Sequence, residues 1–361
     1  MNRSTAEQPV VDADRHAGVT IATVAFRCLA LLKLNVWLTS RLNPQTPVQW
    51  LIAENSPPEE PNRAAVGEFG DMRVLPRVEP DPSHPRVGSD HHARALMSLL
   101  PHVRTRYLLT LDPDFYALQP DWLTQMIRHM QEHDLAFFGV PWHPRWRKYR
   151  YFPCVHCMLI DLERVPVDRL DFRASAAVRP AKEQQSQAEE NARRPDRLKR
   201  WLGEARAHQM RTIIHLLRGG SLVRESPDTG HEIYRQYGDD PLRKSQTIPV
   251  VYQPTDWELR GPLGLAIRCI DRCKPPRRRF LPSRPGYVTR RDFRRRGYID
   301  AQNMGFEEFI WNDKPFAVHI RQWRHAEPVT VDRAVEVVSS LTGLDAPSLE
   351  HQPPMRAGEG K

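Results

Sequence analysis

The sequence has few cysteines and no uninterrupted apolar run long enough to cross a membrane. Its five cysteines among 361 residues show no regular spacing, which argues against a disulfide scaffold and favours reduced thiols. The most apolar stretch, residues 18–42, is interrupted by Arg27, Lys33 and Asn35, which would be costly inside a bilayer. Residues 1–17 lack the order of a secretory signal, and we expect them to be disordered. These absences favour a cytoplasmic protein.

Acidic residues are outnumbered by basic ones, 44 against 53, which gives a net charge of +9. This excess favours a partner that carries phosphates: nucleic acid, a nucleotide-sugar or membrane headgroups. The densest basic segment, residues 272–296, contains no zinc-finger, RNA-recognition or helix-turn-helix pattern, so nucleic acid is a secondary hypothesis. Peripheral contact of this segment with an anionic inner membrane face remains open, as does a solvated basic surface.

Apolar runs of strand length alternate with segments of helical spacing in the first 141 residues. This alternation predicts an α/β fold, with a mostly parallel sheet flanked by helices in a single large domain. The expected strands are 19–26, 48–53, 72–75, 107–111 and 135–140, followed by 155–160, 247–252 and 316–320. The expected helices are 28–42, 93–100, 121–133, 210–217 and 231–237. Residues 174–206 are charged and poor in large apolar residues, and we expect a mobile or solvated helical insertion there.

The strand at residues 107–111 ends in the acidic turn Asp112-Pro113-Asp114. Ligands of open α/β sheets bind at the carboxyl ends of the strands, so these carboxylates lie where a substrate would bind. Carboxylates suit Mn²⁺ or Mg²⁺, ions that leave positions open for diphosphate oxygens. The alternative is a turn that merely ends a strand.

Three segments in order carry a resemblance to a known family: the strand at 19–26, the sequence Glu54-Asn55-Ser56 and the turn Asp112-Pro113-Asp114. Together they resemble the nucleotide-binding half of family 2 glycosyltransferases, which have the GT-A fold and an Asp-x-Asp metal motif. The resemblance implies a nucleotide-sugar-binding half over 18–141, an acceptor-binding half over 142–325, and a C-terminal helix and tail over 326–361. It also implies an inverting, hexosyltransferase-like reaction. The donor would be a UDP-, GDP- or dTDP-sugar, and the acceptor a saccharide, lipid-linked or protein hydroxyl.

The resemblance assigns Glu54 and Asn55 to the nucleobase side of the donor, with Asp112 contacting both nucleotide and metal. His91 and Arg94 lie at the start of a helix, where the family places groups near the diphosphate and where helix N–H groups favour anions. A solvent-facing loop carboxylate is the alternative for Glu54, and a plain surface position is the alternative for His91.

Many GT-A enzymes complete the metal shell with a C-terminal histidine, and His319 has that position beside Asp114 in the resemblance. A structural histidine in an apolar strand is the alternative. Asp228, just before the helix at 231–237, is the implied general base that takes the acceptor proton. Its alternative is an N-cap, a position that Asp favours in any protein.

Aromatic residues at 142–152, among them Trp142, Trp146 and Tyr149, are candidates for an acceptor subsite, because aromatic faces stack on sugar rings. A packed seam is the alternative.

The four thiols of Cys154, Cys157, Cys269 and Cys273 raise the alternative of a structural zinc site.

Two other function classes stay open. A nucleotidyltransferase would share the sheet, but its usual Gly-rich basic loop after the first strand is missing at residues 26–29. In a non-enzymatic basic binding protein, Asp112 and Asp114 would be turn residues only.

Overall fold

The computed structural model describes residues 16–60, 72–82, 84, 87–146, 148–149, 151–174, 204–219, 228–252, 261–274, 287–289, 301–320 and 329–346. Most of the charged insertion at 174–206 and of the basic segment at 272–296 lies outside these residues. So do residues 1–15 and the tail after residue 346.

A seven-stranded sheet in the order β3-β2-β1-β4-β7-β6-β8 forms the centre of the molecule. Only β7 runs against the other strands of this sheet. The strands are β1 (His16–Ala25), β2 (Val48–Glu54), β3 (Arg73–Leu75), β4 (Thr105–Leu111), β6 (Phe137–Pro141), β7 (Pro153–Asp161) and β8 (Ser245–Thr247). The α/β class and the mostly parallel sheet are therefore confirmed.

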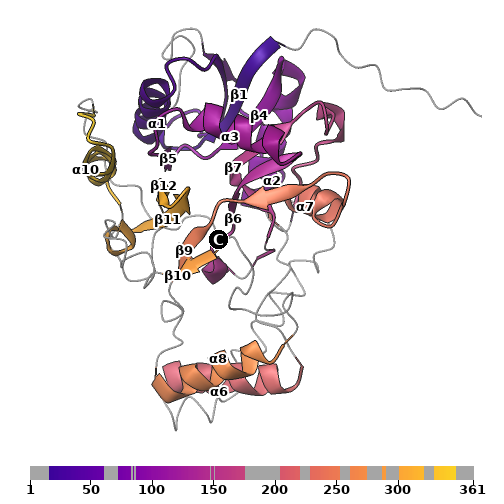
Figure 1. The fold of residues 1–361 in the computed structure, drawn as a ribbon, viewed down its shortest axis with the longest axis vertical. Helices are drawn as coiled ribbons and strands as arrows, with labels where there is room; N and C mark the ends of the chain where they lie inside the picture. The colour runs from indigo at the N-terminus through magenta and orange to yellow at the C-terminus, as the bar shows by residue number, and fades with distance from the viewer. Residues whose placement is uncertain are drawn as a thin grey trace, which may run out of the picture.

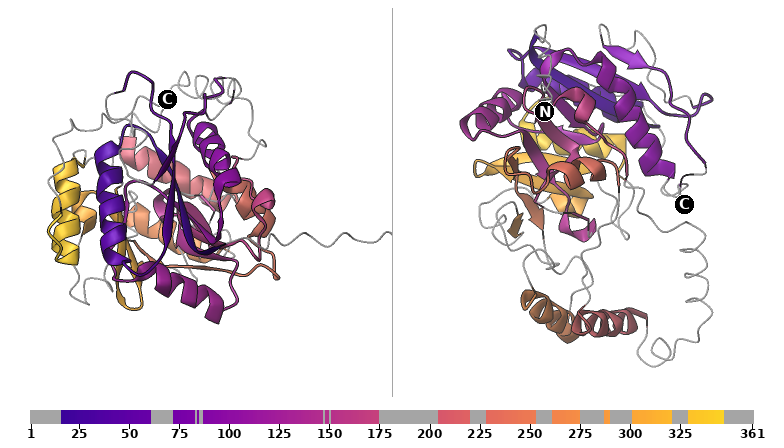
Figure 2. Two further views of the ribbon diagram at one scale, coloured as in Figure 1. Left: turned by 90° about the horizontal axis from the view of Figure 1, so that it is seen from above. Right: turned by 90° about the vertical axis from the view of Figure 1, so that its right-hand side faces the viewer.

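Helices lie on both faces of this sheet, as Figure 2 shows for α1 and α2. The helices around it are α1 (Leu29–Leu42), α2 (Val87–Leu99), α3 (Trp122–Glu132) and α7 (His231–Tyr237), and α10 (Val331–Thr342) packs beside α1. Short 3₁₀ turns occur at Leu100–His102, Pro144–Trp146, Val167–Arg169 and Ala301–Met304. Because both faces are covered, the central strands read as continuous apolar runs, and every residue of β7 is buried.

A second sheet of five strands, in the order β10-β9-β11-β12-β5, lies beside the first (Figure 1). It contains β5 (Phe115–Ala117), β9 (Val250–Tyr252), β10 (Tyr287–Thr289), β11 (Phe306–Trp311) and β12 (Lys314–Ile320). The pattern did not predict this sheet, and the single expected strand at 247–252 is wrong, because it is divided between β8 and β9 of different sheets.

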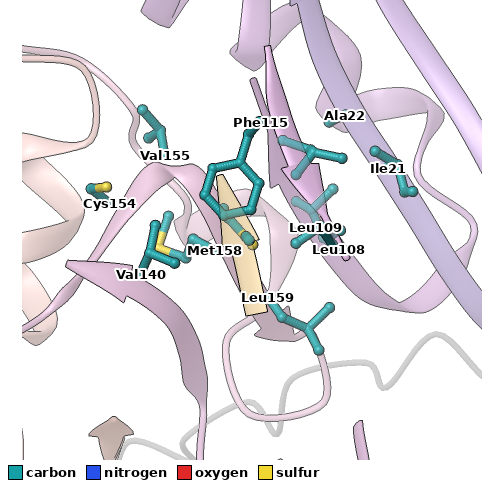
Figure 3. Packing of buried hydrophobic residues seen from close by; sticks show 14 of the residues in the cluster. Ile21, Ala22, Leu108, Leu109, Phe115, Val140, Cys154, Val155, Met158 and Leu159 are labelled. Atoms are coloured by element: carbon teal, nitrogen blue, oxygen red, sulfur yellow. The ribbon is translucent and has the colours of Figure 1, made fainter. Parts of the chain in front are cut away.

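One apolar core joins the two sheets. Buried residues of β1, β4 and β7 form one cluster with Phe115 of β5 (Figure 3). Residues of β11 and β12 belong to the same cluster. This continuity agrees with one large domain. The strand β5 comes from the expected nucleotide-binding half and pairs with β12 of the expected acceptor-binding half, so the two halves interlock.

The helices α6 (Glu204–Leu217) and α8 (Gly261–Arg272) form a separate pair that extends away from the main sheets (Figure 1). A small apolar cluster of Leu216, Ile267 and Tyr252 connects the pair to β9. No helix among the described residues is both long and apolar enough to cross a bilayer.

Gly139 offers a direct test of the β6–β7 pairing. A Cβ at this position would meet the Cys157 carbonyl oxygen and would lie 2.9 Å from Met158 Cα. We expect Gly139→Ala to lower the free energy of unfolding by about 3 kcal/mol or more, because backbone must move. Gly88→Ala is the matched control, since a Cβ there has no neighbour within 4 Å. Equal urea midpoints for the two variants would contradict the pairing.

Candidate functional site

The acidic turn joins the two sheets: β4 ends at Leu111, and β5 begins at Phe115 in the second sheet. The buried side-chain amide of Asn35 on α1 holds this turn. Its Nδ2 donates to the carbonyls of Asp112, Pro113 and Phe115 at 3.1, 3.2 and 2.8 Å. Buried carbonyls need such partners, so the amide fixes where both carboxylates lie.

His156 reaches Asp112 through strand register. Leu111 pairs with Cys157 across β4 and β7, and the next backbone bond runs from Asp112 N to the His156 carbonyl at 3.0 Å. The two side chains therefore lie side by side, with His156 Nδ1 2.5 Å from Asp112 Oδ2.

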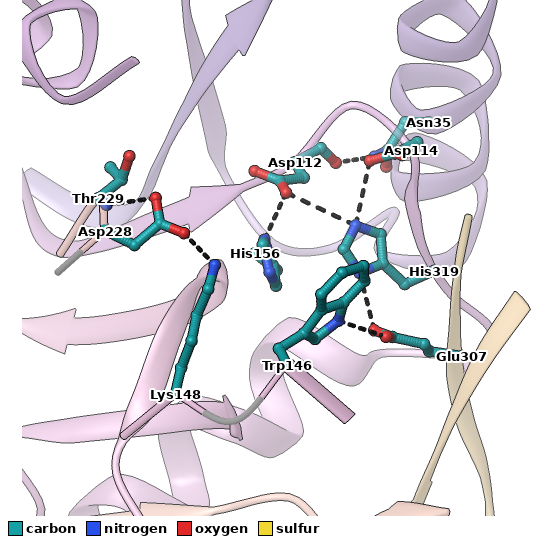
Figure 4. A network of polar contacts seen from close by, with 10 residues as sticks. All are labelled: Asn35, Asp112, Asp114, Trp146, Lys148, His156, Asp228, Thr229, Glu307 and His319. Carbon is teal, nitrogen blue, oxygen red and sulfur yellow. Dashed lines mark hydrogen bonds and ion pairs between the residues drawn. The ribbon is translucent and has the colours of Figure 1, made fainter. Parts of the chain in front are cut away.

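His319 arrives from the other sheet in the same way. It pairs with Phe115 across β12 and β5, and Ile320 N donates to the Asp114 carbonyl at 3.1 Å. His319 Nε2 lies 3.2 Å from Asp114 Oδ1 and 3.5 Å from Asp112 Oδ2 (Figure 4). The expected approach of His319 to the acidic turn thus agrees with the geometry.

Asp112, His156 and His319 each offer one ligand atom within 4.8 Å of the others. Asp114 contacts the same group through His319. A set of two imidazoles with carboxylates is a mixed nitrogen and oxygen site, which fits a first-row divalent ion and is compatible with Mn²⁺ or Mg²⁺.

The local charges suit a cation. Burial opposes ionisation of Asp112, but the charge and hydrogen bond of His156, the hydrogen bond of His319 and the charge of His92 hold its pKa well below the usual value. The thiol of Cys28, at the start of α1, shows the opposite effect. Burial of the thiol is the largest cause, and the negative charges of Asp114, Glu54 and Asp112 act in the same direction. Together they raise the pKa of Cys28 to about 12. The thiol stays protonated, and the negative charge stays on the carboxylates.

Glu307 of β11 lies near His319 Nδ1, on the side of the imidazole away from Asp114. The two residues pair across β11 and β12, and Glu307 Oε2 lies 3.6 Å from His319 Nδ1 while Oε1 accepts from Trp146 Nε1 at 2.8 Å. The carboxylate is buried, and it links the histidine to the aromatic segment (Figure 4).

Asp228 lies in the neighbourhood of this cluster, in an ion pair with Lys148 (Figure 4). Its Oδ1 accepts from Ser89 Oγ at 2.6 Å and from Thr229 N at 2.8 Å. Burial would raise the pKa of Asp228, but Lys148, Ser89 and the Thr229 backbone outweigh it and lower the pKa to about 2. The expected N-cap role is wrong, because the N-cap of α7 is Gly230.

The four other residues expected on the donor side lie around α2 and the end of β2. Glu54 is buried, and its Oε1 accepts from Ser56 N at 2.7 Å, so the solvent-facing alternative is wrong. The amide of Asn55 joins the Val78 N–H to the His91 carbonyl. His91 Nε2 bonds the Val78 carbonyl at 2.5 Å, and burial lowers its pKa. Arg94 forms an ion pair with Asp90 at 3.8 Å.

The aromatic candidates separate into two kinds. Trp142 and Tyr149 are buried: Trp142 lies under Lys148, whose Nζ is 3.5 Å from the ring centroid, and Tyr149 stacks on Tyr234 with centroids 4.3 Å apart. This packing corresponds to the alternative of a packed seam. Trp146 keeps an exposed face and remains a candidate for acceptor contact.

The four cysteines do not come together. Cys154 and Cys157 are buried in β7, whereas Cys269 and Cys273 are exposed on or just after α8 in the separate helical pair. Among the described residues, the cluster suited to a metal contains no cysteine.

Sequence reasoning missed four residues of this region: Asn35, Lys148, His156 and Glu307. The signal for His156 was available, because it is a lone polar residue in an apolar strand, as His319 is. His92, not His91, is the histidine of α2 whose charge acts on Asp112.

No family model matches the chain, and no curated protein matches it. Solved structures with partial overlap include the galactosyltransferase LgtC in complex with donor and acceptor sugar analogues (14% identity, TM-score 0.35, 75% of this chain and 86% of that chain). Another is the mannosyltransferase PcManGT from Pyrobaculum calidifontis with GDP-Man and Mn²⁺ (12%, 0.33, 73% and 79%). A third is glucosyl-3-phosphoglycerate synthase from Mycobacterium tuberculosis with Mn²⁺ and UDP (10%, 0.30, 41% and 58%). Scores of this size carry no residue role to this chain.

The Asp228 ion pair predicts a specific acid dependence of stability. Its folded pKa of about 2 lies below the ordinary 3.8, so the carboxylate stabilises the fold above pH 3.8 and loses this effect as pH falls through 2. We expect Asp228→Asn to be less stable than wild type at pH 7 by about 2 kcal/mol. The difference in the free energy of unfolding between wild type and Asp228→Asn, measured by urea unfolding, should become smaller between pH 4 and pH 2. Asp239→Asn, at an exposed position, is the control. A stability difference between wild type and Asp228→Asn that does not change with pH would count against the ion pair.

Proposed function

We propose that this chain is a metal-dependent glycosyltransferase that moves a sugar from a nucleoside-diphosphate donor to an acceptor hydroxyl. The observation that carries the proposal is the convergence of Asp112, His156 and His319 beside Asp114, where the central strand β4 ends. A bare Asp-Pro-Asp turn would not need two buried histidines aimed at its carboxylates. The GT-A resemblance of the sequence supports the choice of reaction, because it places donor and metal at this same turn.

The four residues have the roles of metal ligands. The carboxylates of Asp112 and Asp114 supply hard oxygen donors, and the imidazoles of His156 and His319 supply nitrogen donors. A divalent ion held by these residues would neutralise charge on the diphosphate of the donor. Glu54 and Asn55 remain the proposed nucleobase side, and Trp146 the proposed acceptor face. Inversion at the anomeric carbon rests on the resemblance to family 2.

Asp228 remains the proposed general base, on the condition that its ion pair with Lys148 is broken first. A carboxylate of pKa about 2 in an ion pair with Lys148 is a poor proton acceptor. The ammonium of Lys148 must therefore turn to another anion before Asp228 takes the acceptor proton. A phosphate oxygen of the donor is an anion of the required kind.

The first test is a screen of UDP-, GDP- and dTDP-sugars for metal-dependent hydrolysis and transfer. We expect His156→Ala and Asp114→Ala each to lower turnover by about 10²-fold or more, since each removes a proposed ligand. His133→Ala, an exposed histidine on the far end of α3, is the control and should keep full turnover.

Metal-independent turnover would favour another mechanism. Release of pyrophosphate from nucleoside triphosphates would favour a nucleotidyltransferase. Absence of metal and nucleotide binding would leave a basic binding protein.

Glu307 allows a sharper test of the metal site. Metal-bound histidines usually donate their second N–H to an acceptor such as a carboxylate, and Glu307 faces His319 Nδ1 from 3.6 Å. We expect Glu307→Gln to weaken Mn²⁺ binding by about 10- to 100-fold, measured by titration of the free Mn²⁺ electron spin resonance signal. The neighbouring Glu308→Gln is the matched control. Glu308 is also buried but accepts instead from Ala301 N at 2.8 Å. Equal affinities for the two variants would remove Glu307 from the site.

A further inference from the structure

The helical pair α6–α8 shows an unusual concentration of exposed aliphatic side chains. Of the seven large apolar residues that are exposed in the described part of the chain, three belong to this pair: Ile214, Leu217 and Leu265. Leu217 and Leu265 are 68% and 54% exposed, so the pair does not bury them against the body of the protein. Apolar groups that remain in water on an extended element mark a contact surface.

Helical spacing arranges these side chains into faces. Ile214 and Leu217 are three residues apart on α6, and Leu265 and Cys269 are four apart on α8, so each set shares one side of its helix. The opposite sides already have a partner, because Leu216 and Ile267 pack together with Tyr252 of β9. One face of each helix therefore packs in the cluster with Tyr252, and the other face exposes apolar side chains.

The charge around these faces has one sign. Among the described side chains of 206–219 and 261–274, six are basic and one is acidic: Arg206, Arg211, Arg218, Arg268, Arg272 and Lys274 against Asp271. Asp271 is buried, whereas Arg206, Arg211, Arg218 and Arg272 are exposed, so the exposed charged groups of this set are basic. Helices that expose leucines flanked by arginines bind at the interface of anionic membranes, where headgroups meet acyl chains.

Other occupants fit these observations less well. A second copy of the chain would bring two basic faces together, which is electrostatically unfavourable. Nucleic acid would match the arginines, but it offers no apolar phase for Leu217 and Leu265.

We propose that the α6–α8 pair docks on the surface of an anionic lipid bilayer, with Ile214, Leu217 and Leu265 entering the headgroup boundary. This surface shares Arg272 and Lys274 with the basic segment at 272–296 that composition singled out, but its apolar residues lie outside that segment. It is independent of the proposed glycosyl transfer, because none of its residues lies in the metal site.

Co-sedimentation tests the proposal with vesicles of phosphatidylcholine, with and without phosphatidylglycerol. We expect binding to the mixed vesicles only. The double variant Leu217→Ser/Leu265→Ser should lower the partition coefficient by about tenfold or more, because two apolar side chains lose their burial. Arg206→Gln and Arg218→Gln should each lower it by about fivefold, and added salt should act in the same direction. Leu242→Ser is the matched control, since Leu242 is 79% exposed but lies between α7 and β8.

A fluorescent label provides a second readout that does not depend on these substitutions. Cys28, Cys154 and Cys157 are buried, so in a Cys273→Ser variant a polarity-sensitive dye reacts at exposed Cys269, on the same face as Leu265. A blue shift of the dye on adding the mixed vesicles supports insertion. Vesicle binding that is unchanged in the double leucine variant would overturn the proposal. So would equal binding to pure phosphatidylcholine, preference for RNA over vesicles, or a leucine-dependent dimer that ignores vesicles.

Discussion

The site depends on one buried amide. Asn35 donates to three carbonyls around Asp112-Pro113-Asp114, and at this turn the chain passes from the seven-stranded sheet to the five-stranded sheet. Because the turn is fixed, backbone pairing on its two sides brings His156 from β7 and His319 from β12 to the same carboxylates. The register of strand pairing thus brings together two histidines that are more than 160 positions apart, and no loop conformation is needed to position them. A site built on strands in this way is held more rigidly than one built on loops.

The second consequence of this arrangement is electrostatic. Carboxylates are rarely removed from water without compensation, and for the partly buried Asp112 the compensation comes from the imidazoles of His156 and His319. Asp112 and Asp114 are joined in one cluster by the two histidines, and Glu307 stands on the far side of His319. Burial keeps the thiol of Cys28 protonated, so this nearby group adds no negative charge to that of the carboxylates. That distribution suits a cation better than it suits a purely structural network.

Most of the central sheet was predictable because its strands alternate with helices and its long strands are apolar; the polar strand β8 is the exception. The turn at Asp112 and Asp114 and the return of His319 were predictable from the family resemblance and agree with the geometry. The second sheet was not, since β5, β9 and β10 have three residues each, and β9 follows β8 after only two residues. The role of His156 depends on β7 running antiparallel beside β4, and no local pattern encodes the order of strands in a sheet. Lys148 reaches Asp228 across 80 positions for the same reason: its partner is set by tertiary packing.

The pairing of Lys148 with Asp228 gives the proposed reaction an order of events. Lys148 contacts both Asp228 and the face of Trp142, and the Trp142 ring packs against the ring of His156 with centroids 4.4 Å apart. Trp142 therefore connects the ammonium that pairs with the proposed base to the histidine that would serve as ligand. An anionic donor bound at the proposed metal site would compete with Asp228 for that ammonium, and the proposed base would become a stronger proton acceptor only with the donor in place. Such coupling would suppress proton abstraction from the acceptor in the absence of donor, because the same lysine serves both anions in turn.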